Sequence, residues 1–160
     1  MVQRRYARAV CRGLVIAGLA LPVWGGVARA EVTLFENLGT WHHEITTTSD
    51  LAQKFFDQGL RLVYAFNHEE AIAAFMEASR LDPDAPMPYW GVALSLGPNI
   101  NAAMDPKLEA RAVEAIQKAS ARVSQATARE RAYVDALALR YSTKKSVARK
   151  AKDEAYAKAM

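Results

Sequence analysis

The sequence predicts an all-α protein built from antiparallel helical hairpins. From residue 49 onward, apolar residues recur at intervals of three and four, which is the period of an amphipathic helix. Residues suited to cap a helix precede these segments, and one Asp-Pro pair marks a helix end while another marks a helix start. The connections between successive helices are short, so neighbouring helices are expected to lie antiparallel.

The first 30 residues have the features of a signal peptide. Arginines precede an apolar run over residues 13–27, and the segment ends in Ala-Arg-Ala at 28–30, small residues that a signal peptidase accepts. The run is short for a membrane span, and no stop-transfer segment follows, although a retained anchor is the alternative. We predict Sec-dependent export with cleavage after Ala30 and no stable membrane insertion afterwards; the arginine pair at 4–5 also resembles a twin-arginine signal. Either route leads to a periplasmic or extracellular protein.

The charge of the chain is concentrated in this segment. The whole sequence has 21 basic and 17 acidic residues, a net +4. Residues 1–30 hold five of the basic residues and no acidic one, which leaves 16 basic against 17 acidic residues, or net −1. This removes the main argument for a nucleic-acid partner. Cys11, the only cysteine, lies in the same segment, so the rest of the chain is expected to be stabilised by packing and not by disulfides.

Residues 31–48 show no helical period and are predicted to form an extended lead-in. The segment contains Phe35, Leu38 and Trp41, followed by three consecutive threonines. Because these apolar side chains would form a sticky patch if they were free, we expect them to lie over the first helices.

The first hairpin is predicted over residues 49–83. An apolar stripe through residues 51–66 indicates one helix, capped by the Ser-Asp pair that precedes it. Asn67 and Glu70 resemble a capping box that opens the second helix, and the Asp-Pro pair at 82–83 ends it.

A second hairpin is predicted over residues 86–121. It carries a seven-residue insertion within 97–104, before an Asp-Pro pair begins its second helix. A long loop in a tight helical array is a place to look for function. The alternative is that Asn99 and Asn101 only satisfy the backbone of a turn.

A third hairpin is predicted over residues 127–160. Thr127 and Glu130 form a capping box at its start, and the segment from about Thr143 is Ala- and Lys-rich and helical to Met160. Its basic run is interpreted as a solvated helix face, with an anionic partner as the alternative. No helix stop follows, so we expect this repeat to be truncated and the array to continue.

The spacing within the hairpins resembles the tetratricopeptide repeat (TPR), whose helical hairpins stack into an α-α superhelix, or solenoid. Small residues at two of the positions allow the helices to approach closely, a phenylalanine fills the space between them, and a proline ends the second helix. The positions that match the repeat are Phe55, Gly59, Ala71, Phe75, Ala78, Pro83, Tyr89 and Ala93.

Several short motifs are similar to those of a narrower family of exported bacterial TPR proteins. They are Leu-Gly-Thr-Trp-His-His at 38–43, Gln-Gly-Leu at 58–60, Tyr-Ala-Phe-Asn-His-Glu-Glu-Ala at 64–71, Tyr-Trp-Gly at 89–91 and Gly-Pro-Asn-Ile-Asn at 97–101. The resemblance covers about residues 38–160. It implies binding and scaffolding, without a known reaction, ligand or cofactor.

The first functional hypothesis is a module that binds a protein or peptide through the concave surface of the first helices. Gln58, Arg61, Asn99 and Asn101 are the candidate contact residues. Catalysis is not expected, because no serine stands in a nucleophile elbow and the paired acids belong to helix ends.

The second hypothesis is a metal- or redox-linked auxiliary protein that uses His42, His43 and His68, which have glutamates beside them. Adjacent histidines on an extended strand point to opposite sides, which argues against one ion held by His42 and His43 together.

Four aromatic residues, Tyr64, Phe66, Tyr89 and Trp90, are able to stack on a ligand. Their helical spacing favours a place in the core.

Overall fold

The computed structural model describes residues 32–141 and 147–160, and the part described is all-α. The predicted signal peptide lies outside the described residues. The helices belong to one compact unit, Glu31–Met160. In chain order the helices are α1 (Asp50–Tyr64), α2 (His68–Leu81), α3 (Pro86–Leu96), α4 (Pro106–Ser120), the short 3₁₀ helix η1 (Val123–Gln125), α5 (Ala128–Arg140) and α6 (Arg149–Ala159).

The first hairpin consists of α1 and α2, which pack against each other. The Ser49 side chain accepts a hydrogen bond from the backbone N–H of Ala52, which confirms the predicted cap of α1. The capping box predicted at the start of α2 is wrong, because Asn67 occupies the cap position but its side chain makes no capping bond. The turn instead places Phe66 in the left-handed region, at φ 61°.

The second hairpin consists of α3 and α4, joined by the loop that the sequence singled out. Asp105 caps α4 by accepting a hydrogen bond from the backbone N–H of Lys107, as predicted. Within the loop, Asn99 and Ala102 form an isolated antiparallel bridge. The predicted insertion is therefore an ordered turn with its own backbone pairing.

The third hairpin begins with the predicted capping box. The Thr127 side chain accepts from the backbone of Glu130, and the Glu130 side chain accepts from the backbone of Thr127. The last helix, α6, begins at Arg149, later than the sequence suggested, and residues 142–146 lie outside the described part.

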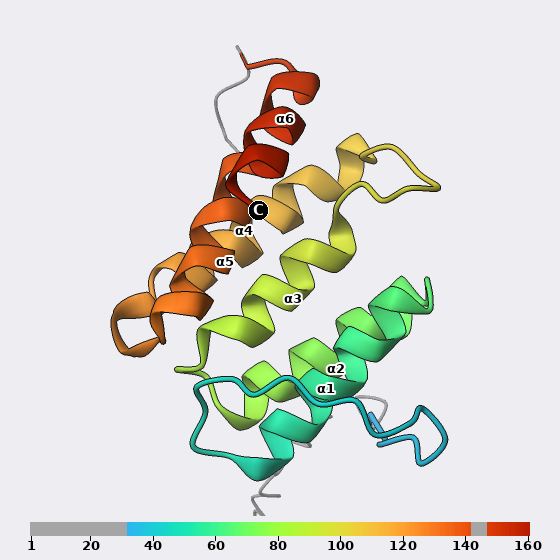
Figure 1. Cartoon of the computed structure of the whole chain (residues 1–160). Coiled ribbons are helices and arrows are strands. Elements are labelled where there is room, and N and C mark those ends of the chain that lie inside the picture. The colour runs from blue at the N-terminus through green and yellow to red at the C-terminus, as the bar shows by residue number, and fades with distance from the viewer. Residues whose placement is uncertain (1–31, 142–146) are drawn as a thin grey trace, which may run out of the picture. The chain divides into compact units, whose positions relative to one another are not determined.

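The first helices of the three hairpins lie next to one another. Helix α3 contacts α1 on one side and α5 on the other, while α2 and α4 pack between successive hairpins (Figure 1). The lead-in runs as an extended segment across α1 (Figure 1). In the described residues, no helix is long and apolar enough to cross a membrane.

The core of the first two hairpins is organised around Phe75 of α2, which is fully buried. A Cβ atom built on Gly59 of α1 would lie 2.7 Å from the Phe75 ring, and one built on Gly91 of α3 would lie 2.5 Å from it. The ring therefore fills the space that two glycines leave open, and Phe56 packs on it with a centroid distance of 5.4 Å. Gly91 is not among the positions that the TPR spacing singled out.

A second close contact ties the third hairpin to the second. The Tyr141 hydroxyl, just after α5, donates a 2.7 Å hydrogen bond to the carbonyl oxygen of Ala93, and burial raises the pKa of this phenol above its usual value. A Cβ atom on Gly97 would lie 2.1 Å from the same hydroxyl. Only glycine fits at the end of α3 while this bond is in place.

Phe75→Ala should lower the free energy of unfolding by about 3–5 kcal/mol, because the helices that flank the ring cannot close the cavity it leaves. Urea unfolding followed by circular dichroism measures this cost. A change of less than about half a kcal/mol would contradict the central place of this ring.

Gly91→Ala provides the matched control. Its new methyl group would collide with the Phe75 ring, so the single variant should lose about 1–3 kcal/mol. In the Phe75→Ala background the same methyl enters the cavity, and the double variant should be no less stable than Phe75→Ala alone. Equal costs in both backgrounds would show that another group limits the approach of α3.

Candidate functional site

The lead-in is held to α1 mainly through its backbone. Gln53, Asp57 and Arg61 follow one another at intervals of four and therefore share one face of the helix. Asp57 accepts a 3.0 Å hydrogen bond from the backbone N–H of His43, and the Arg61 guanidinium donates to the carbonyl oxygen of Trp41. These bonds fix the path of an extended segment that pairs with no strand in the described part of the chain.

Two glutamines act as clamps on this segment. The Gln53 amide accepts from the backbone N–H of Ile45 at 3.0 Å and donates to the carbonyl oxygen of His43 at 2.9 Å. Gln58 does the same further along the lead-in, accepting from Phe35 at 2.7 Å and donating to Thr33 at 2.9 Å. Each amide thus satisfies a carbonyl and an N–H two residues apart, as a neighbouring strand would.

Two buried carboxylates anchor the C-terminal end of the lead-in. Glu130 of α5 accepts 2.6 Å hydrogen bonds from both the backbone N–H and the hydroxyl of Thr46. Asp82, after α2, accepts from the Thr47 hydroxyl at 2.6 Å and from the backbone N–H of Thr48 at 2.7 Å. The threonines therefore join the lead-in to the end of the first hairpin and to the start of the third.

These hydrogen bonds decide the ionisation of both acids. Burial opposes the charged form of Glu130, but the bonds from Thr46 and Thr127 outweigh it and hold the pKa of the carboxyl below its usual 4.5. The balance at Asp82 is the same, with burial exceeded by the bonds from Thr47, Thr48 and Asp84, and its pKa lies below 3.8. Both groups are ionised at neutral pH.

The lowered pKa of Glu130 predicts how stability depends on pH. Its ionised form contributes stability above pH 4.5, and this contribution is lost as the pH falls from there through the lower pKa of the folded protein. Glu130→Gln should be about 1–3 kcal/mol less stable at pH 7, because the buried N–H groups lose a charged acceptor. Urea unfolding between pH 7 and pH 3 should show a smaller dependence on pH in the variant. Parallel profiles would contradict this role of Glu130.

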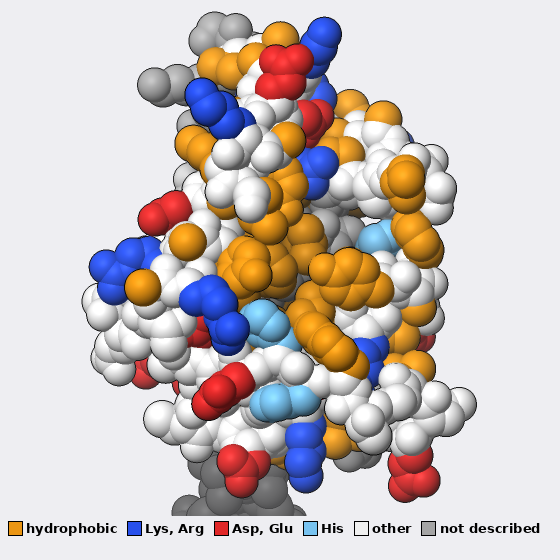
Figure 2. All heavy atoms as spheres, viewed as in Figure 1, with side chains coloured by type: hydrophobic (Ala, Val, Ile, Leu, Met, Phe, Trp, Pro, Cys, Tyr) orange, Lys and Arg blue, Asp and Glu red, His pale blue; other side chains and the backbone are white. Residues whose placement is uncertain are grey.

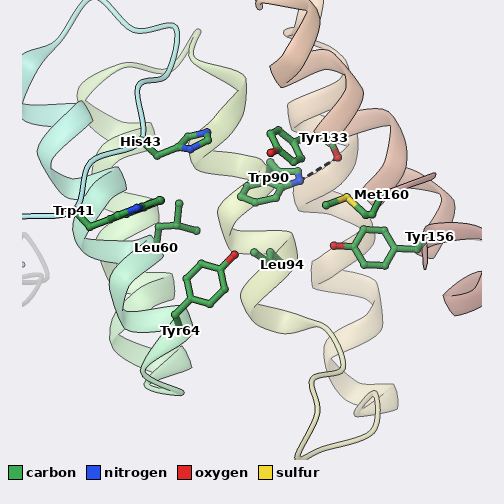
Figure 3. A pocket seen from close by; sticks show the side chains of 9 residues that line it. All are labelled: Trp41, His43, Leu60, Tyr64, Trp90, Leu94, Tyr133, Tyr156 and Met160. Atoms are coloured by element: carbon green, nitrogen blue, oxygen red, sulfur yellow. Dashed lines mark hydrogen bonds between the residues drawn. The ribbon is translucent and has the colours of Figure 1, made fainter. Parts of the chain in front are cut away.

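A pocket of about 240 Å³ lies beside the lead-in, on the face formed by α1, α3, α5 and the C-terminal end of α6 (Figure 3). Hydrophobic side chains gather at the centre of this face, with histidines beside them (Figure 2). None of the described residues that line the pocket has an acidic side chain or a lysine or arginine side chain. The lining residues are Trp41, His43, Leu60, Tyr64, Trp90, Leu94, Tyr133, Tyr156 and Met160.

Three phenol groups supply most of the polarity of the pocket. Tyr64 and Tyr156 reach in from opposite sides with their hydroxyl ends toward one another (Figure 3). Burial raises the pKa of Tyr156 above its usual value against the positive charge of Arg140, and the proximity of Tyr64 and Tyr133 adds to the increase. Among the described residues, no partner is found for any of these three hydroxyls, whereas the Trp90 indole N–H donates a 3.1 Å bond to the Tyr133 carbonyl oxygen. The phenols are thus available to a ligand.

His43 forms part of the pocket wall. Its ring stacks on Trp41 with a centroid distance of 5.9 Å and meets Tyr133 edge-on at 6.2 Å. Burial lowers the pKa of His43 below its usual 6.5, and nearby Arg129 acts in the same direction against the carboxylates of Asp57 and Glu130. At neutral pH the imidazole is therefore uncharged and offers one donor and one acceptor.

Two of the aromatic residues expected in the core are at the surface. Tyr64 is 75% exposed and Phe66 is 52% exposed, whereas Trp90 is 7% exposed and Tyr89 is half-buried. Trp41 and Met160, both on the pocket, are 51% and 60% exposed. A cluster of large exposed side chains around one hollow is typical of an interaction site.

The four predicted contact residues lie in different places. Gln58 is buried and Arg61 donates to the lead-in, so both hold the chain itself. In the loop, the Asn99 amide nitrogen lies 3.2 Å from Nε2 of His68, and its oxygen accepts from the backbone N–H of Asn101. Asn101 is exposed.

The structure does not bring the three histidines together. His42 Nδ1 lies 2.7 Å from an Asp57 oxygen, His43 faces the pocket, and His68 contacts Asn99 at the start of α2. His68 Nδ1 is buried and has no hydrogen-bond partner in the described part of the chain. No group of three or more His, Cys, Asp or Glu suited to a metal ion occurs among residues 32–141 and 147–160.

Sequence reasoning missed most of the pocket, although a signal for it exists. Three segments each place two large side chains four residues apart, and in each pair both side chains line the pocket. These pairs are Leu60 and Tyr64, Trp90 and Leu94, and Tyr156 and Met160.

No family model, no curated protein and no solved structure matches this chain.

Proposed function

We propose that this protein is an exported, TPR-like helical-repeat scaffold that binds a segment of a partner protein, or a peptide, in the aromatic pocket. The pocket carries the proposal, because it combines a hollow with exposed Trp41, Tyr64 and Met160. Large aromatic side chains that are already ordered lose little conformational entropy on binding, and they dominate the energetics of many interfaces.

The size of the pocket favours a segment of a polypeptide over a drug-sized small molecule. At about 240 Å³ it lies below the roughly 300–1,000 Å³ of sites that enclose drug-sized molecules. One or two side chains of a docked segment fit such a space, while the rest of the segment lies on the surrounding face.

The order of the helices supports the repeat part of the proposal. Helices α1, α3 and α5 are neighbours, and each hairpin follows the previous one along the chain. This is the arrangement expected of stacked hairpins whose first helices line one face. The pocket lies on that face, where TPR-like modules would present residues to a peptide.

The binding proposal is tested with a library of peptides displayed on phage and selected on the full chain. Peptides that are enriched should bind Tyr64→Ala at least about tenfold more weakly, because a central aromatic anchor typically contributes more than 1 kcal/mol. Fluorescence of the pocket tryptophans, Trp41 and Trp90, measures the dissociation constants.

Leu139→Ala is the matched control, since Leu139 is 50% exposed on α5 but does not line the pocket. It should change affinity by less than about twofold. If no peptide is enriched, or if the enriched peptides bind Tyr64→Ala and the native protein equally, the pocket is not the binding site.

Export is tested separately, by expressing the whole chain in a bacterial host and fractionating the cells. The protein should be found outside the cytoplasm with Glu31 as its first residue, as measured by mass spectrometry. Ala30→Leu should block cleavage, because the peptidase requires a small residue at this position. Unprocessed native chain in the cytoplasm would contradict the proposal.

A further inference from the structure

On the basis of the proposed function, we propose that the segment bound in the pocket is proline-rich, in the polyproline II conformation, with an acidic residue beside the prolines. The polar and apolar groups that converge on the pocket carry this inference, together with the charges that flank it.

The apolar groups provide faces for proline rings. Trp41, Trp90 and Tyr64 come from three different segments and present ring surfaces around one hollow (Figure 3). Proline-rich segments dock in aromatic-lined grooves of this kind, and they lose little entropy because the polyproline II helix is already formed in the free peptide.

The polar groups match the backbone of such a segment. A polyproline II helix makes no internal hydrogen bonds, so its carbonyl oxygens are free to accept, and proline has no N–H that needs an acceptor. The hydroxyls of Tyr64, Tyr133 and Tyr156 are donors without a partner in the described residues, and His43 adds a neutral imidazole. None of the described lining residues has a carboxylate side chain that would compete for a donor from the ligand.

The charges around the pocket indicate an acidic neighbour. Arg129 lies one helical turn before Tyr133 on α5, on the same face as this lining residue, and its charge lowers the pKa of His43. It is exposed and forms no ion pair with residues 32–141 or 147–160. The Arg140 guanidinium lies 4.7 Å above the Tyr156 ring while it pairs with Asp153. The nearby acids, Asp57 and Glu130, are buried and hydrogen-bonded to the lead-in. The guanidinium of Arg129 is therefore an exposed charge that an acidic residue of the ligand can reach.

A sugar ring is the main competing ligand, since it also stacks on aromatic faces. Its several hydroxyls, however, require donors and acceptors together, which carboxylate and amide side chains usually supply. The described lining has neither of these groups. The phenols and His43 could pair with some sugar hydroxyls, but without carboxylate or amide side chains the described lining would pair fewer of them, at a cost in affinity.

The test compares synthetic ligands on the full chain, with tryptophan fluorescence and calorimetry as readouts. The probes are octaproline with two glutamates at one end, the same peptide with two lysines, an alanine-glycine peptide of equal length and charge, and maltohexaose. We expect saturable binding of the two octaproline peptides only. The dissociation constant of the octaproline with glutamates should be about 2- to 5-fold lower than that of the octaproline with lysines.

Variants separate the contributions. Tyr64→Phe and Tyr156→Phe remove a hydroxyl but keep the ring, and each should weaken the glutamate form by about 2- to 10-fold. Arg129→Gln should abolish the preference for the octaproline with glutamates over the octaproline with lysines. It should leave the loss of affinity caused by each Tyr→Phe substitution unchanged. Lys118→Gln, on α4 and away from the pocket lining, is the charge control and should alter neither.

The outcomes distinguish this inference from the proposed function. The inference is overturned if the octaproline and alanine-glycine peptides bind with equal affinity. It is also overturned if neither Tyr→Phe variant changes the affinity for octaproline. Tighter binding of maltohexaose overturns it as well. If the phage selection yields peptides that depend on Tyr64 but lack proline, the inference fails and the proposed function stands.

Discussion

The contact between Phe75 and two glycines is the constraint on which the rest of the structure depends. Gly59 and Gly91 let α1 and α3 approach the same ring, which sets the separation of these two helices. Each glycine directly neighbours a residue of the pocket, Leu60 on α1 and Trp90 on α3. The side chain that fills the core on one side of the two helices therefore also determines the width of the hollow on the other side. A substitution that changes the core packing would be felt in the pocket, without any direct contact with a ligand.

The lead-in depends on a different kind of interaction, because polar side chains hold it. An extended segment without a neighbouring strand leaves its N–H and carbonyl groups unpaired, at a cost for each group that is buried. Gln53 and Gln58 supply both partners at two points, while Asp57 and Glu130 supply charged acceptors. Glu130 combines this role with the capping of α5. The start of the third hairpin and the end of the lead-in are thus joined by one carboxylate.

The features that were predictable from the sequence are those set by local chemistry. The caps at Ser49 and Thr127 follow from short-range bonds, and the helices follow from their apolar period. The partners of Glu130 and Asp82 in the lead-in lie far away in the sequence, so no local pattern reveals them. The period also misplaced Tyr64, because an exposed aromatic groove and a buried core produce the same spacing of large apolar residues along a helix. Distinguishing the two requires knowing which face the neighbouring hairpins leave uncovered.

Anchoring the lead-in by its backbone leaves its side chains free for the pocket. Both backbone groups of His43 are bound by α1, to Asp57 and Gln53, so the ring is oriented without a bond of its own. Trp41 is held through its carbonyl oxygen, and its indole remains half exposed. The side chains of α1 that hold the lead-in bind backbone atoms, which every residue has. The bonds therefore do not restrict which side chains can stand at positions 41 and 43 of the lead-in. The side chains of this wall of the pocket can therefore vary without loss of the bonds that hold the lead-in in place.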